Sequence, residues 1–186
     1  MIDIADIKND IESSQAQMRK LQAETIHAIA IKPSGKIEVV DKERLEGLNA
    51  EIDRLTALVD HNSKVLEKAV GALGSFPSLS AARERRAVVD SGINRTNGLL
   101  RIDIAALIKS RPDIDPGNPY AHPEAKKLKD GADKDLARSM PELKRLDELI
   151  RLAEAIIADF QPSGLRPMEI TGAHAITRES VAGFGL

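Results

Sequence analysis

Apolar residues recur at alternating steps of three and four positions from residue 41 to residue 73. This spacing predicts one long α-helix with a single narrow apolar seam, a pattern typical of a coiled coil. Asp41 suits the N-cap of that helix, and Gly74 follows it, where helices commonly end in a left-handed residue. The seam consists of Leu45, Leu48, Ile52, Leu55, Val59, Asn62, Leu66, Ala69 and Leu73.

A second helix is predicted over residues 3–26, capped by Asp3. Its stripe contains Ile4, Ile7, Ile11, Met18 and Leu21, with Ser14 at one core position. The long helix would measure about 50 Å, so something must lie alongside it. We therefore predict that the two helices pack as an antiparallel coiled-coil hairpin over residues 1–74. Because the first helix is shorter, the long helix needs another partner from about Val59 onward.

In the segment that joins these helices, the spacing of apolar residues changes from a helical to a strand-like period. Ile and Val alternate with other residues on both sides of Pro33-Ser34-Gly35, which predicts a small β-hairpin at the tip of the helical hairpin. The alternative is a plain loop in which Ile29 and Ile31 cover the end of the coil. The order helix, β-hairpin, long helix resembles the prefoldin-type chaperone subunits over residues 1–74. That resemblance implies a holdase function.

Three further segments follow. Residues 75–112 form a basic helical segment with seven Arg or Lys against three Asp or Glu, and Asn97-Gly98 predicts a kink or turn within it. Residues 113–160 hold a Pro-rich loop, a short helix from Pro123 to Lys129, and a last helix. A capping box formed by Ser139 and Glu142 marks the start of that last helix. Its stripe is Leu143, Leu146, Ile150, Ala153, Ile157 and Phe160.

Residues 161–186 are predicted to be an extended C-terminal tail without a core of its own. Isolated apolar residues, rather than a periodic face, mark this segment. We expect Ile170, Ile176 and Phe184 to anchor it on a neighbouring subunit. The fold predicted for the whole chain is mainly α.

The amino-acid composition argues against several classes of function. Aromatic residues make up 2% of the chain, which disfavours the aromatic-lined pockets that bind small molecules. The formal net charge of −2 gives no overall basic bias toward nucleic acid, and the absence of Cys excludes thiolate chemistry. No apolar run approaches the roughly 20 residues that cross a bilayer.

Few residues are candidates for chemistry. In the Pro-rich loop, Asp113, Asp115, Asn118 and His122 offer ligands for a hard cation, but the same residues are common turn formers, and we assign no metal or cofactor. Arg83 and Arg86 would contact phosphates, an acidic subunit or solvent. Asn62 in the seam either fixes helix register and partner number or marks a local gap open to water.

The sequence therefore favours a non-enzymatic structural or assembly protein that forms a homo-oligomer and contacts other structural subunits. Within that class we expect a bacteriophage virion component: a connector, tail or internal head protein. Its location would be the virion or the host cytoplasm. The expected interaction residues are Leu48, Ile52, Leu55, Val59, Asn62, Leu66, Arg83, Arg86, Ile170, Ile176 and Phe184. The alternatives are a prefoldin-like chaperone or coiled-coil adaptor and, third, a DNA-packaging accessory that uses the basic helix.

Overall fold

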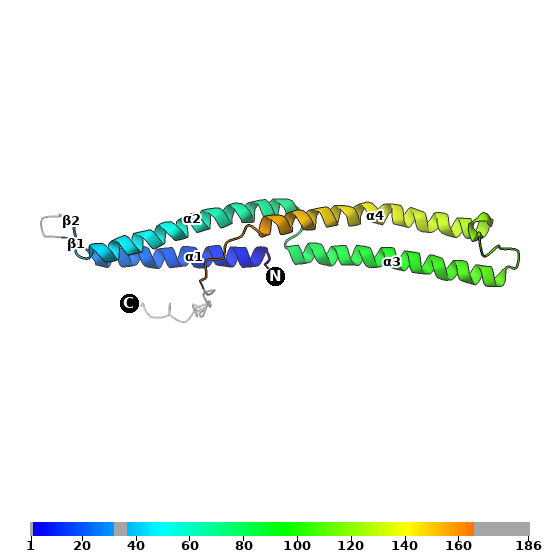
Figure 1. Ribbon diagram of the computed structural model, residues 1–186, viewed down its shortest axis with the longest axis horizontal. Coiled ribbons are helices and arrows are strands. Elements are labelled where there is room, and N and C mark those ends of the chain that lie inside the picture. Colours follow the sequence, from blue (N-terminus) through cyan, green and yellow to red (C-terminus); the bar gives the residue numbers. More distant parts are fainter. Residues whose placement is uncertain (1, 32–36, 166–186) are drawn as a thin grey trace, which may run out of the picture. The chain divides into compact units, whose positions relative to one another are not determined.

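The computed structural model describes residues 2–31 and 37–165, and the chain is mainly helical (Figure 1). The α-helices among these residues are α1 (Ile4–Thr25), α2 (Lys42–Leu73), α3 (Leu79–Ser110) and α4 (Pro123–Ile157). Short 3-10 helices, η1 (Ile26–Ala28) and η2 (Pro119–Ala121), follow α1 and precede α4. The helices and strands form two compact units, which we describe separately.

Unit 1 comprises Met1–Lys8 and Ala57–Gln161, and α3 and α4 are its main helices. These two helices run antiparallel, because Arg83 near the start of α3 pairs with Glu154 near the end of α4, and Arg111 just after α3 pairs with Glu124 at the start of α4. Val89, Ile93 and Leu146 form a buried core between them, with Phe76, Leu136 and Leu143 packed against it.

Helix α4 differs from the sequence prediction. The short helix that ends near Gly131 and the separate start at Ser139 are both wrong, since one helix runs through Pro141. A proline inside a helix costs about 3 kcal/mol. The stripe of α4 explains why the helix tolerates it, because buried residues continue at heptad-like spacing on both sides of the proline: Ala125, Ala132, Leu146, Ile150, Ala153 and Ile157.

The predicted interruption at Asn97-Gly98 is also wrong. Helix α3 passes through both residues and through Gly92, and a side chain at Gly92 or Gly98 would meet open space. Each glycine lowers helix stability by about 1 kcal/mol relative to alanine. Burial of Leu79, Ala82, Val89, Ile93 and Ile104 along one face of α3 offsets that local cost.

Unit 2 comprises Asn9–Thr56 together with the described residues 162–165. In this unit Glu24 of α1 pairs with Arg44 of α2 at 3.6 Å, and the Thr56 hydroxyl donates to Sδ of Met18 at 3.3 Å. The α1 residue with the lower number contacts the α2 residue with the higher number. These parts of the two helices therefore run antiparallel. Strands β1 (Ile29–Ile31) and β2 (Ile37–Val39) pair antiparallel, with Ile29 opposite Val39. The turn predicted at 33–35 lies outside the described residues.

Ser14 lies fully buried in the stripe of α1, and its hydroxyl has no hydrogen-bond partner in the described part of the chain. A buried, unsatisfied hydroxyl costs about 1–3 kcal/mol. We therefore expect Ser14→Ala to raise the free energy of unfolding by about 1 kcal/mol, which urea denaturation followed by circular dichroism would measure. An unchanged or lower value would mean that the Ser14 hydroxyl is already satisfied.

Candidate interaction site

The seam residues of α2 are packed inside the chain. Leu55, Val59 and Asn62 are buried, and the other predicted interaction residues on this helix, Leu48, Ile52 and Leu66, are half-buried. The heptad spacing therefore predicts the buried face of α2. Leu55, Val59 and Asn62 are thus covered by the chain's own residues, and a contact of this face with another subunit stays a prediction.

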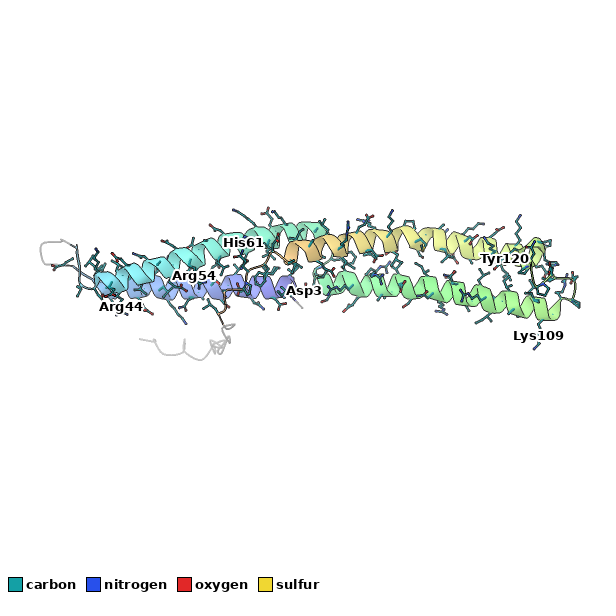
Figure 2. The ribbon with its side chains drawn as sticks, viewed as in Figure 1. Asp3, Arg44, Arg54, His61, Lys109 and Tyr120 are labelled. Atoms are coloured by element: carbon teal, nitrogen blue, oxygen red, sulfur yellow. The ribbon has the colours of Figure 1, made fainter. Side chains whose placement is uncertain are left out.

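Asn62 holds the chain segment that follows α4 against α2. Its Nδ2 donates to the backbone oxygen of Gln161 at 2.8 Å, and the backbone N–H of Gln161 donates to its Oδ1 at 3.2 Å. At the preceding residue of the same helix, Nε2 of His61 lies 2.8 Å from the carbonyl oxygen of Asp159 (Figure 2). The end of α4 is thus a partner of α2 beyond Val59. Within unit 1, Asn62 fixes where the chain leaves α4.

Replacing Asn62 with Leu removes both hydrogen bonds to Gln161 while keeping a side chain of similar size. Since it leaves a partly buried backbone N–H and C=O unpaired, we expect a loss of about 1–3 kcal/mol in the free energy of unfolding. Amide hydrogen exchange at Gln161 should accelerate in the variant. If exchange at Gln161 were unchanged, the Asn62 side chain would not hold this segment.

Arg83 and Arg86 bind α4. Arg83 contacts Glu154 at 2.6 Å, Arg86 contacts Asp147 at 2.6 Å, and Arg85 contacts Glu142 at 2.7 Å. The hydrogen bond to Asp147 raises the pKa of Arg86, so its charge is retained at any relevant pH. These side chains are partly exposed, and such pairs contribute at most about 1 kcal/mol each. Their role is to align the two helices, and each arginine already has a carboxylate partner.

Asp3 joins the N-termini of α1 and α3 in unit 1 (Figure 2). One carboxylate oxygen accepts the N–H of Ile4 at 2.7 Å and that of Leu79 at 2.9 Å. The other accepts the backbone N–H of Ser80 at 3.2 Å and its hydroxyl at 2.7 Å. Each helix leaves its first N–H groups without intrahelical partners, and one carboxylate here supplies acceptors for both. The sequence identifies Asp3 as the cap of α1 but does not reveal its second helix.

The Pro-rich loop uses its polar side chains for local structure. Asp115 accepts the N–H of Gly117 at 2.8 Å, and Nδ1 of His122 accepts the N–H of Glu124 at the start of α4. Asp113 lies beside Arg111, whose hydrogen bond lowers the pKa of the carboxyl. Within residues 2–31 and 37–165, no three His, Asp or Glu side chains converge as metal ligands would.

Ile170, Ile176 and Phe184 lie outside the described residues, so their predicted role as anchors stays a prediction. The chain leading toward them is held in unit 2. There, Asp10 accepts the backbone N–H of Ser163 at 3.0 Å and its hydroxyl at 2.6 Å. The described start of the predicted tail is therefore fixed on α1.

In the described residues, no helix combines the length and apolarity needed to cross a membrane. The chain was compared with protein-family models, with curated proteins and with solved structures. No family model matches it, and neither a curated protein nor a solved structure is significantly similar to it.

Proposed function

We propose that this chain is a non-enzymatic structural or assembly protein that works as a homo-oligomer. The observation that supports the proposal is that the apolar residues of the chain are buried between paired helices. Buried and half-buried positions recur at steps of three and four along α1, α2 and α4, and along most of α3, so the core consists of helix–helix seams. Helix α3 alone has 32 residues and measures about 48 Å. Long paired helices of this kind suit a protein that spans distances and presents surfaces to neighbours.

For the arrangement of α1 and α2 we propose an antiparallel coiled-coil hairpin that carries a β-hairpin at its tip. The contacts of Glu24 with Arg44 and of Met18 with Thr56 support the first part. The pairing of β1 with β2 supports the second. Single-cysteine pairs placed at exposed positions beside these contacts would test the arrangement, because the sequence contains no native Cys. Failure of these pairs to cross-link with a short bifunctional thiol reagent would contradict it.

We further propose that the C-terminal tail, residues 161–186, binds a neighbouring subunit in the assembly through its part beyond Leu165. Ordering such a segment costs about 1–2 kcal/mol per residue in backbone entropy, so its apolar anchors need a surface to bind. A chain that ends at Leu165 keeps the contact between Ser163 and Asp10. We expect this truncated chain to retain its helix content and to sediment as a smaller species than the full chain. If the truncated and full chains sediment with the same number of subunits, the tail does not contribute to the assembly.

Among assemblies of this type we propose a bacteriophage virion, as a connector, tail or internal head protein. Three features of the sequence support a virion protein: heptad-spaced helices, near-zero net charge and a C-terminal tail with isolated apolar anchors. Mass spectrometry of purified phage particles from the source strain would test it directly. The proposal requires the chain to co-purify with particles in stoichiometric amounts, and its absence from them would refute it.

A prefoldin-like chaperone or a coiled-coil adaptor is the second candidate. The observation that favours it is the paired strands β1 and β2 placed between α1 and α2, which is the element order of prefoldin-type subunits. Suppression of the aggregation of a heat-denatured client protein at stoichiometric ratios would favour the chaperone over the structural role. A DNA-packaging role is weaker, since Arg83, Arg85 and Arg86 already bind α4. It would require duplex binding that weakens steeply with salt.

A further inference from the structure

Three large aliphatic side chains lie exposed beside the strand pair of unit 2. Ile26 in η1 is 65% exposed, Val39 in β2 is 46% exposed, and Val40 directly after β2 is 68% exposed. The N–H of Val40 donates to the carbonyl oxygen of Ala28 at 2.9 Å, which holds the end of β2 beside η1. Among the side chains that the structure describes in unit 2, no other large hydrophobic one is exposed. We call these three residues the aliphatic patch.

The outer edge of β2 is open to a further strand. In an antiparallel pair, the backbone groups of successive residues alternate between bonding the partner strand and pointing away from it. Because Val40 bonds Ala28, directly before β1, the N–H and C=O of Val39 point away from β1. On the other edge, the N–H of Ile29 already donates to Ile26. The described sheet has two strands, so β2 offers the edge to which a strand can add.

The C-terminal tail leaves the described structure in the same unit. Asp10 on α1 accepts the backbone N–H and the hydroxyl of Ser163, and the description ends two residues later at Leu165. From Asp10 to the end of α1 at Thr25 the helix axis is about 23 Å long. The strand pair therefore lies about this far from the point at which the tail is held.

The length of the chain decides which part of the tail reaches the aliphatic patch. An extended chain covers about 3.3 Å per residue. Ile170 therefore lies within about 23 Å of Ser163 and arrives only at the end of α1. Ile176 lies within about 43 Å of Ser163 and passes this point with length to spare. Ile176 and the following Thr177 are both β-branched, a residue type that favours strands.

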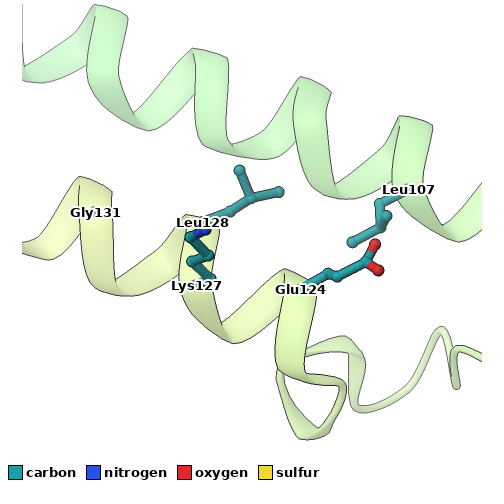
Figure 3. A pocket seen from close by; sticks show the side chains of 5 residues that line it. All are labelled: Leu107, Glu124, Lys127, Leu128 and Gly131. Atoms are coloured by element: carbon teal, nitrogen blue, oxygen red, sulfur yellow. The ribbon is translucent and has the colours of Figure 1, made fainter.

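The apolar hollow between α3 and α4 in unit 1 is the alternative surface for the tail. Figure 3 shows Leu107 and Leu128 pointing into this hollow. Leu128 lies about 44 Å of helix axis before the end of α4 at Ile157. The strand pair is about half as far from Asp10. Since a shorter tether gives a higher local concentration, the strand pair is the favoured surface.

We propose that residues 174–177 of the tail add to the outer edge of β2 in the same chain as a third strand. The tail comes from α1, in the direction in which α1 leads into β1, so the added strand runs antiparallel to β2. Ile176 lies opposite Val39, whose backbone groups point outward. Side chains of opposite residues share one face of a sheet, so Ile176 covers the aliphatic patch.

This inference goes beyond the proposed function. It assigns Ile176 to the chain's own strands and leaves residues 178–186, with Phe184, as the part of the tail that reaches a neighbouring subunit.

Disulfide trapping in the full chain tests the proposal, because the sequence contains no native Cys. The register places Ala175 opposite Val40 in a non-hydrogen-bonded pair, in which Cα atoms lie about 4.5 Å apart, a distance that a disulfide spans. Val40→Cys with Ala175→Cys should close within one chain under mild oxidation. Ala50→Cys with Ala175→Cys is the matched control, since Ala50 is exposed on α2 in the same unit. We expect the control pair to close on the order of tenfold more slowly.

The mass of the oxidised product separates the possible occupants of the β2 edge. A product of single-chain mass supports the proposal. A covalent dimer formed through Val40→Cys and Ala175→Cys would mean that the tail of a neighbour binds this edge, which overturns docking within one chain. Equal rates for the test pair and the control pair would mean that β2 does not hold the tail, which also overturns the proposal.

Amide hydrogen exchange at Val39 provides a second readout, because its N–H bonds the tail in the proposed sheet. Ile176→Pro removes an N–H and disrupts the added strand, so we expect exchange at Val39 to accelerate about tenfold. Ile170→Pro is the control, since it precedes the strand and should leave this exchange as in the native chain. Unchanged exchange in Ile176→Pro would overturn the third strand. Sedimentation of the native chain tests the homo-oligomer separately, so the two proposals fail independently.

Discussion

Replacing Leu55 with Asp is expected to lower the free energy of unfolding by about 4 kcal/mol or more. The side chain of Leu55 is fully buried, and the seam of α2 continues on either side of it with Ile52 and Val59. A carboxylate at this position would lose its hydration without gaining a partner. Protonation would relieve part of the cost, so the destabilisation should be smaller at acidic pH than at neutral pH.

Ala50→Asp is the control for this substitution. Ala50 lies on α2 with its side chain exposed, so the same new carboxylate would remain in water there. Its expected effect is within about 0.5 kcal/mol. Urea denaturation of both variants at one fixed protein concentration makes the comparison, since the proposed self-association would also contribute to stability. Similar midpoints for the two variants would show that the register of the seam is misplaced.

Removing the carboxylate of Asp3 is expected to destabilise two helices at once. Asp3→Ala takes away the acceptor for Ile4 at the start of α1 and for Leu79 and Ser80 at the start of α3. One N-cap contributes about 0.5–2 kcal/mol, so the double cap should contribute between about 1 and 4 kcal/mol. Asp41→Ala is the matched control, because the Asp41 carboxylate accepts the N–H of Arg44 and so caps a single helix, α2. Equal losses for the two variants would contradict the double role of Asp3.

The same contacts of Asp3 predict that the stability of the fold depends on pH in the acidic range. Burial raises the pKa of Asp3, but hydrogen bonds from the Ser80 hydroxyl and from the N–H groups of Leu79, Ile4 and Ser80 outweigh it, and the pKa lies below its usual value of 3.8. The folded state therefore binds this proton less readily than the unfolded state. The stabilisation is fully present above about pH 4 and is lost as the pH falls through the lowered value. The stability difference between native and Asp3→Ala chains should shrink in that range.

The sequence predicts burial along a helix better than it predicts where a helix begins. The spacing along α2 identifies Leu55, Val59 and Asn62, and it identifies the position of Ser14 on α1, because a 3–4 repeat depends only on helix geometry. In α4, Gly131 and Pro141 are local signals for helix ends. They are overridden because the stripe from Ala125 to Ile157 packs on α3.

The interaction features depend on tertiary proximity, which local pattern does not contain. Asn62 contacts Gln161 and Asp3 contacts Ser80, and both pairs are distant in the sequence. The arginines of α3 predict a basic surface until α4 places a carboxylate beside each of Arg83, Arg85 and Arg86.

The native mass of the full chain tests the central claim most directly. Sedimentation equilibrium over a range of protein concentrations measures it without reference to shape. A homo-oligomeric assembly protein should give a whole-number multiple of the 20.2 kDa chain mass, with dissociation on dilution. A single species of 20.2 kDa at every concentration would contradict the proposal that this chain functions by associating with itself.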